Sequence, residues 1–197
     1  IIEYNNTMKG MNVGERILAS LFSATTARTA GFNSVDTGSL TSASKLLTCV
    51  LMFIGGSPGS TAGGIKTTTI FILVVSLWSG ITDRHKTAVF KRRFEDDAIK
   101  KASTVFTLNM FLAIFALFTI LAITDLSLSD VMFEVFSAIG TVGMTTGITR
   151  DLSSAARIII MVLMFCGRVG SLSFALTFLQ GKKDPPVYYP EEEISVG

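Results

Sequence analysis

The chain has 197 residues, of which 49% are hydrophobic, only 16% are charged and 15 are phenylalanine. This composition is too apolar for an ordinary soluble domain and indicates a membrane protein, with the lipid bilayer as its first partner. The formal net charge of +2 gives no reason to expect a nucleic-acid partner.

Two apolar runs near the start, KLLTCVLMFI and TIFILVVSLW, flank the glycine-rich loop GGSPGSTAGGIKTTT at 55–69. A Walker A motif requires glycine directly before its lysine, but Ile65 precedes Lys66, and no β-rich strand comes before the loop. The spacing therefore disfavours a phosphate-binding loop. Segment 45–80 is long enough to span a membrane only if the loop lies inside it, and a plain kink at Pro58 is the simpler alternative.

Further along, 104–123 is a run of twenty residues without a charge. At about 1.5 Å per residue such a helix crosses a ~30 Å hydrocarbon core. Residues 155–180 are also long enough, despite one arginine near the middle. Seven of the 17 Lys and Arg residues fall in 81–103, and a lysine pair follows the last span at 182–183. The positive-inside tendency places both basic segments in the cytoplasm, as parts of a multi-pass protein of the cell membrane.

The two parts of the chain are related by an internal repeat. SASKLLTCVLMFIGG at 42–56 aligns with SAARIIIMVLMFCGR at 154–168, and the same offset of 112 pairs TAGF at 29–32 with TVGM at 141–144. Each copy contains a short apolar helix of about ten to twelve residues, too short to span, then Thr-x-Gly, then an interrupted apolar segment.

The second copy is preceded by the span 104–123, whose counterpart would leave only the tail of a helix over residues 1–9. We therefore expect the chain to be a piece of a longer protein. Both copies have the same orientation, which disfavours the inverted repeats of many secondary transporters.

The two Thr-x-Gly units are candidates for an ion-selectivity filter. A helix that stops midway leaves backbone polar groups at membrane depth, where only a water-filled cavity or surrounding protein can accommodate them. A glycine with φ > 0 lets successive carbonyls face one axis and replace the hydration shell of K⁺. Thr-x-Gly is also ordinary turn material, but two copies at one repeat position favour the filter. The candidate filter residues, with K⁺ at their backbone carbonyls, are Thr29, Ala30, Gly31, Phe32, Thr141, Val142, Gly143 and Met144.

Arg168 is the second unusual feature of the last span. An arginine at a helix centre costs at least ~2.5 kcal/mol, so it should face a water-filled path or a partner. A structural ion pair with Glu134 is one alternative. Because the repeat counterpart of Arg168 is Gly56 in the loop, we expect a gate just cytoplasmic to the filter. The gate residues would be Gly55, Gly56, Ser57, Pro58, Gly59, Ser60, Thr61, Ala62, Gly63, Gly64, Lys66 and Arg168.

Four stretches, TARTAGFNSVD, GGSPGSTAGGIKTTT, GTVGMTTGIT and CGRVGSL, resemble the Trk/Ktr/HKT superfamily of cation transporters, specifically the membrane subunit of a bacterial Ktr or Trk system. The resemblance implies an all-α membrane protein of tandem helix–pore helix–helix repeats of potassium-channel type, with re-entrant pore helices and broken inner helices. The chain resembles the third and fourth of four such repeats. These would be 1–80, with its first helix truncated, and 104–181, joined by the cytoplasmic linker 81–103 and followed by a cytoplasmic tail at 182–197.

The same resemblance implies the partners: a homodimer, a cytosolic ring of KtrA- or TrkA-like nucleotide-binding regulatory subunits, and the N-terminal half of the same protein. The expected function is gated, selective K⁺ uptake without enzymatic catalysis or an organic cofactor, with Na⁺ as a candidate activator. An alternating-access secondary cation transporter is the alternative, and an ATPase built on the glycine-rich loop is a third. The proline-rich, acidic tail is typical of a disordered end, with docking on the dimer or a regulatory subunit as its alternative.

Overall fold

The computed structural model describes residues 2–4, 6–82, 88–89 and 92–170. Over these residues the fold is all-helical, as expected, apart from one two-stranded antiparallel hairpin and a short 3-10 turn. In chain order the elements are α1 (Val13–Thr26), α2 (Ser42–Phe53), α3 (Thr67–Ile81), β1 (Ala88–Val89), β2 (Arg92–Arg93), α4 (Asp96–Ile123), α5 (Leu128–Ile139), η1 (Ile148–Arg150) and α6 (Ser154–Val169).

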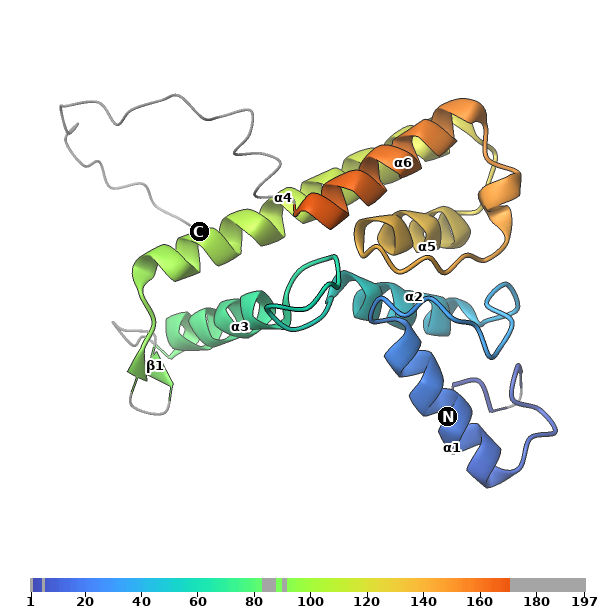
Figure 1. Cartoon of the computed structure of the whole chain (residues 1–197), viewed down its shortest axis with the longest axis horizontal. Helices are drawn as coiled ribbons and strands as arrows, with labels where there is room; N and C mark the ends of the chain where they lie inside the picture. The colour runs from blue at the N-terminus through green and yellow to red at the C-terminus, as the bar shows by residue number, and fades with distance from the viewer. Residues whose placement is uncertain (1, 5, 83–87, 90–91, 171–197) are drawn as a thin grey trace.

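The long helix α4 is the helix against which most of the others pack. Within the described ranges it alone is long and apolar enough to cross a membrane. It packs against α3, α5 and α6, and α5 packs in addition against α2. Figure 1 shows α4 and α6 side by side, the short α5 beside them, and α1 projecting away from the other helices. The short helix α5 is therefore enclosed on several sides.

Burial along α5 follows from this position. Val131, Val135 and Ile139 recur every four residues, as an apolar helix face requires, and all three are fully buried. Phe133, on another face, is fully buried as well. A helix too short to span is thus held within the protein by α2, α4 and α6.

Three helices begin after a residue whose side-chain hydroxyl caps the helix N-terminus. Thr41, Ser127 and Ser153 each accept a hydrogen bond from the backbone N–H three residues later, at 3.3 Å in every case. Such caps satisfy donors that the first helical turn leaves free. They fix where α2, α5 and α6 begin.

Three predicted boundaries change. The span predicted over 104–123 is the end of a helix that begins at Asp96, with acidic residues in its first turn as the helix dipole favours. The predicted linker 81–103 therefore contains the β1–β2 hairpin and the first turns of α4. Helix α6 ends at Val169, and the remainder of 155–180, like the predicted tail, lies outside the described residues.

The predicted helix tail over residues 1–9 is wrong, because the described part of this segment forms turns. Glu3 is buried there and accepts hydrogen bonds from Asn6 and Thr7 at 2.9 and 3.0 Å. It also accepts one from the N–H of Thr41 at 3.0 Å. A carboxylate that satisfies donors in the turn and at the α2 cap favours this folded turn over a helix.

Candidate functional site

The two Thr-x-Gly units have the same unusual backbone. Thr29 and Gly31 have φ of 71° and 75°, and Thr141 and Gly143 have φ of 51° and 86°. Left-handed backbone at a non-glycine residue is uncommon, so its occurrence at both threonines is a specific match. A left-handed residue at every second position turns successive carbonyls toward one side, which regular strand geometry does not do.

These two units lie directly against each other. A Cβ placed on Gly31 would lie 2.3 Å from the carbonyl oxygen of Val142, so only glycine fits there. Beyond the units, the hydroxyl of Thr37 donates a hydrogen bond to the carbonyl of Thr145. Two segments from different copies of the repeat are therefore in contact, while their role as two walls of one path stays a prediction.

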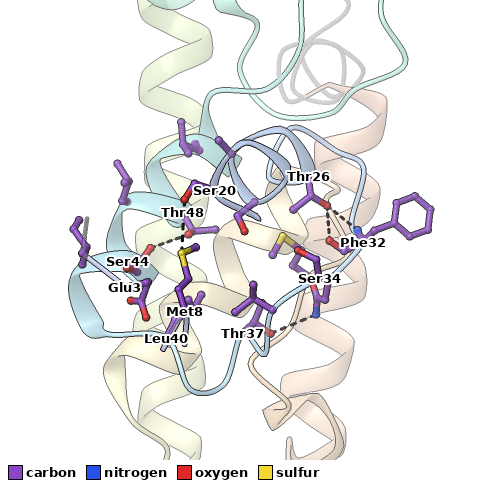
Figure 2. Close-up of a pocket in the computed structure, with 18 residues that line it drawn as sticks. Glu3, Met8, Ser20, Thr26, Phe32, Ser34, Thr37, Leu40, Ser44 and Thr48 are labelled. Carbon is purple, nitrogen blue, oxygen red and sulfur yellow. Dashed lines mark hydrogen bonds between the residues drawn. The ribbon is translucent and has the colours of Figure 1, made fainter. Parts of the chain in front are cut away.

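Thr26, which the sequence did not single out, anchors the end of the first unit. Its hydroxyl accepts a hydrogen bond from the N–H of Phe32 at 2.8 Å and donates one to the carbonyl of Phe32 at 2.6 Å (Figure 2). The Phe32 ring points outward and is 70% exposed, whereas Met144 at the matching position is buried.

A cavity of about 530 Å³ lies beside this first unit (Figure 2). Its walls come from the N-terminal turns, α1, the segment after Thr26, α2 and Met144, and they are mainly apolar with several hydroxyls. The carboxylate in the wall is Glu3, which is already occupied by hydrogen bonds from Asn6, Thr7 and Thr41. No group of three or more His, Cys, Asp or Glu side chains suited to a metal ion occurs in the described part of the chain.

Asp36 lies in the exposed turn between the first unit and α2. Hydrogen bonds from Ser39 and from the N–H of Gly38, the latter 3.2 Å from Oδ1, lower the pKa of its carboxyl group. This side chain therefore carries a negative charge at neutral pH.

The glycine-rich loop is a closed structure between two helices. Its base is held by three backbone hydrogen bonds, from Gly55 N to Ile65 O at 2.8 Å, Ile65 N to Phe53 O at 3.1 Å, and Thr67 N to Gly56 O at 3.2 Å. The plain kink is therefore wrong, because α2 ends at Phe53 and α3 begins only at Thr67.

At its tip, Ser57 to Ser60 forms a reverse turn closed by a 3.1 Å hydrogen bond between the N–H of Ser60 and the carbonyl of Ser57. Proline is the second residue and Gly59, with φ of 81°, the third, which is the sequence preference of a type II turn.

Two cations hold three successive carbonyls of the loop. The Lys66 ammonium donates to the carbonyls of Ser60 at 3.3 Å and Ala62 at 2.5 Å. Between them, the carbonyl of Thr61 accepts a hydrogen bond from Nη1 of Arg168. The structure thus brings Arg168 and the loop together, as the repeat position predicted. Because Lys66 donates its hydrogen bonds to carbonyls of its own loop, the geometry does not support a phosphate site.

The alternative partner for Arg168 was Glu134, and this pair does not form. Glu134 Oε1 instead accepts hydrogen bonds from the hydroxyls of Thr145 and Thr149. Among the described residues the salt bridge that occurs is Lys45–Asp130, at 2.8 Å between α2 and α5. Neither residue was predicted as functional, although a lysine at the start of an apolar run is a signal that could have been followed.

Glycines of the loop and of α6 pack closely against the end of α5 and the residue that follows it. A Cβ on Gly63 would lie 2.2 Å from Oγ1 of Thr141, and a Cβ on Gly167 would lie 2.1 Å from the carbonyl of Ile139. The loop therefore contacts the first residue of the second Thr-x-Gly unit, and α6 contacts the last residue of α5, Ile139.

The chain is similar to known proteins over nearly its whole length. The family model described as TrkH, cation transport protein, matches residues 3–184. The whole chain is 37% identical to the Ktr system potassium uptake protein B of Bacillus subtilis, covering 44% of that protein. It is also 37% identical to the potassium/sodium uptake protein NtpJ of Enterococcus hirae, over 93% of this chain and 42% of that protein.

The fold resembles the crystal structure of the potassium transporter TrkH from Vibrio parahaemolyticus. The TM-score is 0.70 at 20% identity, covering 91% of this chain and 40% of that one. The chain thus spans less than half the length of the relatives it matches. Because the family model matches nearly the whole chain, the chain belongs to the TrkH family of cation transport proteins, which are transporters and not enzymes.

Proposed function

We propose that this chain is part of the ion-translocating membrane subunit of a Ktr- or Trk-type system and mediates K⁺ uptake through a gated, channel-like filter. The observation that carries the proposal is the shared left-handed pattern at Thr29/Gly31 and Thr141/Gly143, in two segments that touch at Gly31 and Val142. Carbonyls turned to one side at membrane depth can replace the hydration shell of an ion. The names of the relatives point to potassium as that ion.

In this proposal the chain supplies two of four filter walls, as the third and fourth helix–pore helix–helix repeats. Helices α1 and α5 are the re-entrant pore helices, and the filter runs over 29–32 and 141–144. In keeping with a further neighbour, a Cβ on Gly143 would meet none of the described residues within 4 Å, whereas the matching Gly31 is packed against Val142. The N-terminal half of the same protein would supply the remaining walls.

The gate in this proposal is the loop 55–67 together with Arg168. The loop touches Thr141, and the guanidinium group is bonded to Thr61. At ~5 Å and an effective dielectric of about 20, the repulsion between this charge and a passing K⁺ is about 3 kcal/mol before screening by water. A barrier of that height slows permeation roughly a hundredfold.

The partners follow from the family and the relatives. A subunit of a Ktr system would work with a cytosolic ring of KtrA-like nucleotide-binding subunits and as a homodimer, in the cell membrane. Movement of that ring would act on α3, which is joined directly to the loop at Thr67. Na⁺ would act as an activator or a second transported ion.

The test is ion flux through the complete subunit, reconstituted in proteoliposomes with and without the regulatory ring. We expect K⁺ to move only down its electrochemical gradient, with a reversal potential that follows the K⁺ gradient in mixed K⁺ and Na⁺. Uptake against the electrochemical gradient of K⁺, driven by a second ion, would overturn the channel-like mechanism in favour of alternating access.

A further inference from the structure

We propose that Glu134 is a positioning residue for the filter: its buried carboxylate holds Thr145, whose carbonyl is held in turn by Thr37 of the neighbouring segment. One carboxyl group thereby fixes the spacing of two filter walls, and with it the preference for K⁺ over Na⁺. The inference rests on the proposed function, since it assigns a role within that filter.

Glu134 is placed where a carboxylate is costly. It lies on α5 between Phe133 and Val135, both fully buried, and is itself only 5% exposed. A buried carboxylate is tolerated when hydrogen bonds compensate for the lost water. Here a single oxygen, Oε1, accepts from the Thr145 hydroxyl and from the Thr149 hydroxyl at 2.9 Å, and these two hydroxyls are 2.8 Å apart.

Thr145 is the residue that links this carboxylate to the path. It follows Met144 directly, at the end of the second Thr-x-Gly unit. Its hydroxyl also accepts a hydrogen bond from the N–H of Gly147 at 2.9 Å, so its side chain is fixed from two sides. Its carbonyl accepts the hydroxyl hydrogen of Thr37, which is buried. A continuous chain of bonds thus runs from Glu134 through Thr145 to Thr37.

This anchor belongs to one repeat and not to the other. The first unit is anchored by Thr26, which holds both backbone groups of Phe32. In α1 the positions matching Glu134 are Phe22 at the offset of 112 and Ser20 if two residues slip, and neither carries a carboxylate. The short helix of the first repeat therefore forms without a carboxylate at this position. This favours a role for Glu134 that is specific to the second wall.

The experiment measures K⁺ over Na⁺ permeability ratios from bi-ionic reversal potentials, using the complete subunit in lipid bilayers. Glu134→Ala is expected to lower the ratio at least fivefold, because the second wall can then shift relative to the first. Glu134→Gln keeps an oxygen that accepts the same two bonds and should retain most of the ratio. Thr145→Val should lower the permeability ratio as Glu134→Ala does. Thr145→Ser keeps the hydroxyl and should leave the ratio near the wild-type value.

If Glu134 and Thr145 act on selectivity through the same connection, a double variant provides a further test. The double variant Glu134→Ala/Thr145→Val should lower the ratio no more than either single change, since both remove the same connection. The matched control is Ser153→Ala, which removes the N-cap of α6 and leaves the hydrogen bonds of Glu134, Thr145 and Thr37 in place. It should lower the thermal unfolding midpoint while leaving the permeability ratio unchanged.

Correctly folded Glu134→Ala or Thr145→Val with a wild-type ratio would overturn the inference. If Glu134→Ala does not fold, Thr145→Val decides, because it exchanges one hydroxyl for a methyl group. Gly31→Ser separates this outcome from failure of the proposed function. A changed ratio in Gly31→Ser with an unchanged one in the Thr145 and Glu134 variants rejects only the positioning role, whereas unchanged ratios in all of them reject the filter.

Discussion

Gly63 of the glycine-rich loop packs against Thr141, the first residue of the second Thr-x-Gly unit. A Cβ added to Gly63 would lie 2.2 Å from Oγ1 of Thr141 and 3.0 Å from the carbonyl of Gly140. This Thr141 hydroxyl is buried and has no hydrogen-bond partner within the described structure. The loop therefore contacts the first residue of this unit at a distance that only glycine permits.

The first prediction is that Gly63→Ala displaces the loop and raises K⁺ flux in the unliganded complex several-fold, because the added methyl group cannot fit while the loop is docked. The measurement is K⁺ uptake into proteoliposomes with the regulatory ring in its resting state. Gly80→Ala on α3 is the matched control, since a Cβ there meets nothing within 4 Å. Equal flux in the two variants would contradict a role for loop docking.

Two glycines of the filter units differ in what surrounds them, and the second prediction uses this difference. Gly31→Ser must accommodate both a left-handed φ and a contact of 2.3 Å with Val142, whereas Gly143→Ser meets only the φ of 86° in this chain. A left-handed residue with a side chain costs roughly 1–2 kcal/mol. Both variants should lower the K⁺ over Na⁺ permeability ratio, with the larger loss at Gly31. Unchanged reversal potentials in mixed K⁺ and Na⁺ would reject the filter assignment.

Lys45 and Asp130 join α2 to α5 by a largely buried ion pair, with side chains 11% and 23% exposed. Removing one partner leaves the other charge buried, and such losses cost about 3–5 kcal/mol for fully buried pairs. We therefore predict that Lys45→Met lowers the unfolding temperature in detergent by several degrees. The double variant Lys45→Met/Asp130→Leu should recover much of the loss. A double variant less stable than Lys45→Met would show that the stranded charge is not the cause.

The features that could be predicted from the sequence are those that depend on residue types at short, fixed spacing along the chain. The loop, the short helices and the paired Thr-x-Gly units each depend on glycine, threonine and apolar residues at fixed spacing, which a repeat makes visible. The proximity of Arg168 to the loop was predicted because the repeat gives both the same position. Their roles as gate and filter remain proposals.

The features that the sequence missed depend on contacts between distant segments. Thr37 bonds to Thr145 across 108 positions, and Lys45 bonds to Asp130 across 85. Nothing near either residue indicates such a partner. The alternative pairing of Arg168 with Glu134 was wrong for a related reason: charge alone suggested it, whereas two nearby hydroxyls satisfy the carboxylate.

A fourth prediction concerns the number of walls. Residues 1–197 carry two filter units, and the proposed pore needs four, so reconstitution of this polypeptide alone should give no K⁺-selective flux. Co-expression with the remaining repeats should restore it. Selective uptake by the polypeptide alone would contradict the prediction unless cross-linking shows two copies around one axis.

The last prediction concerns Arg168, whose guanidinium group holds the loop at Thr61 and places a positive charge near the path. Arg168→Ala removes both the hydrogen bond and the electrostatic barrier, and deletion of Ser60 to Gly63 removes the docked part of the loop. Each change should raise K⁺ flux in the unliganded complex, by roughly a hundredfold for the unscreened barrier of about 3 kcal/mol and roughly tenfold for a partly screened one. The permeability ratio should stay the same in Arg168→Ala, because the described hydrogen bond of Arg168 goes to the loop and not to a proposed filter residue. The deletion also removes the contact of Gly63 with Thr141, so the ratio is compared in Arg168→Ala. Arg157→Ala is the control: this arginine lies on the same helix but donates to the carbonyl of Arg150 at 2.7 Å, not to the loop. Uptake is measured in proteoliposomes with equal amounts of folded protein, and flux at or below wild type in both variants would reject the gate.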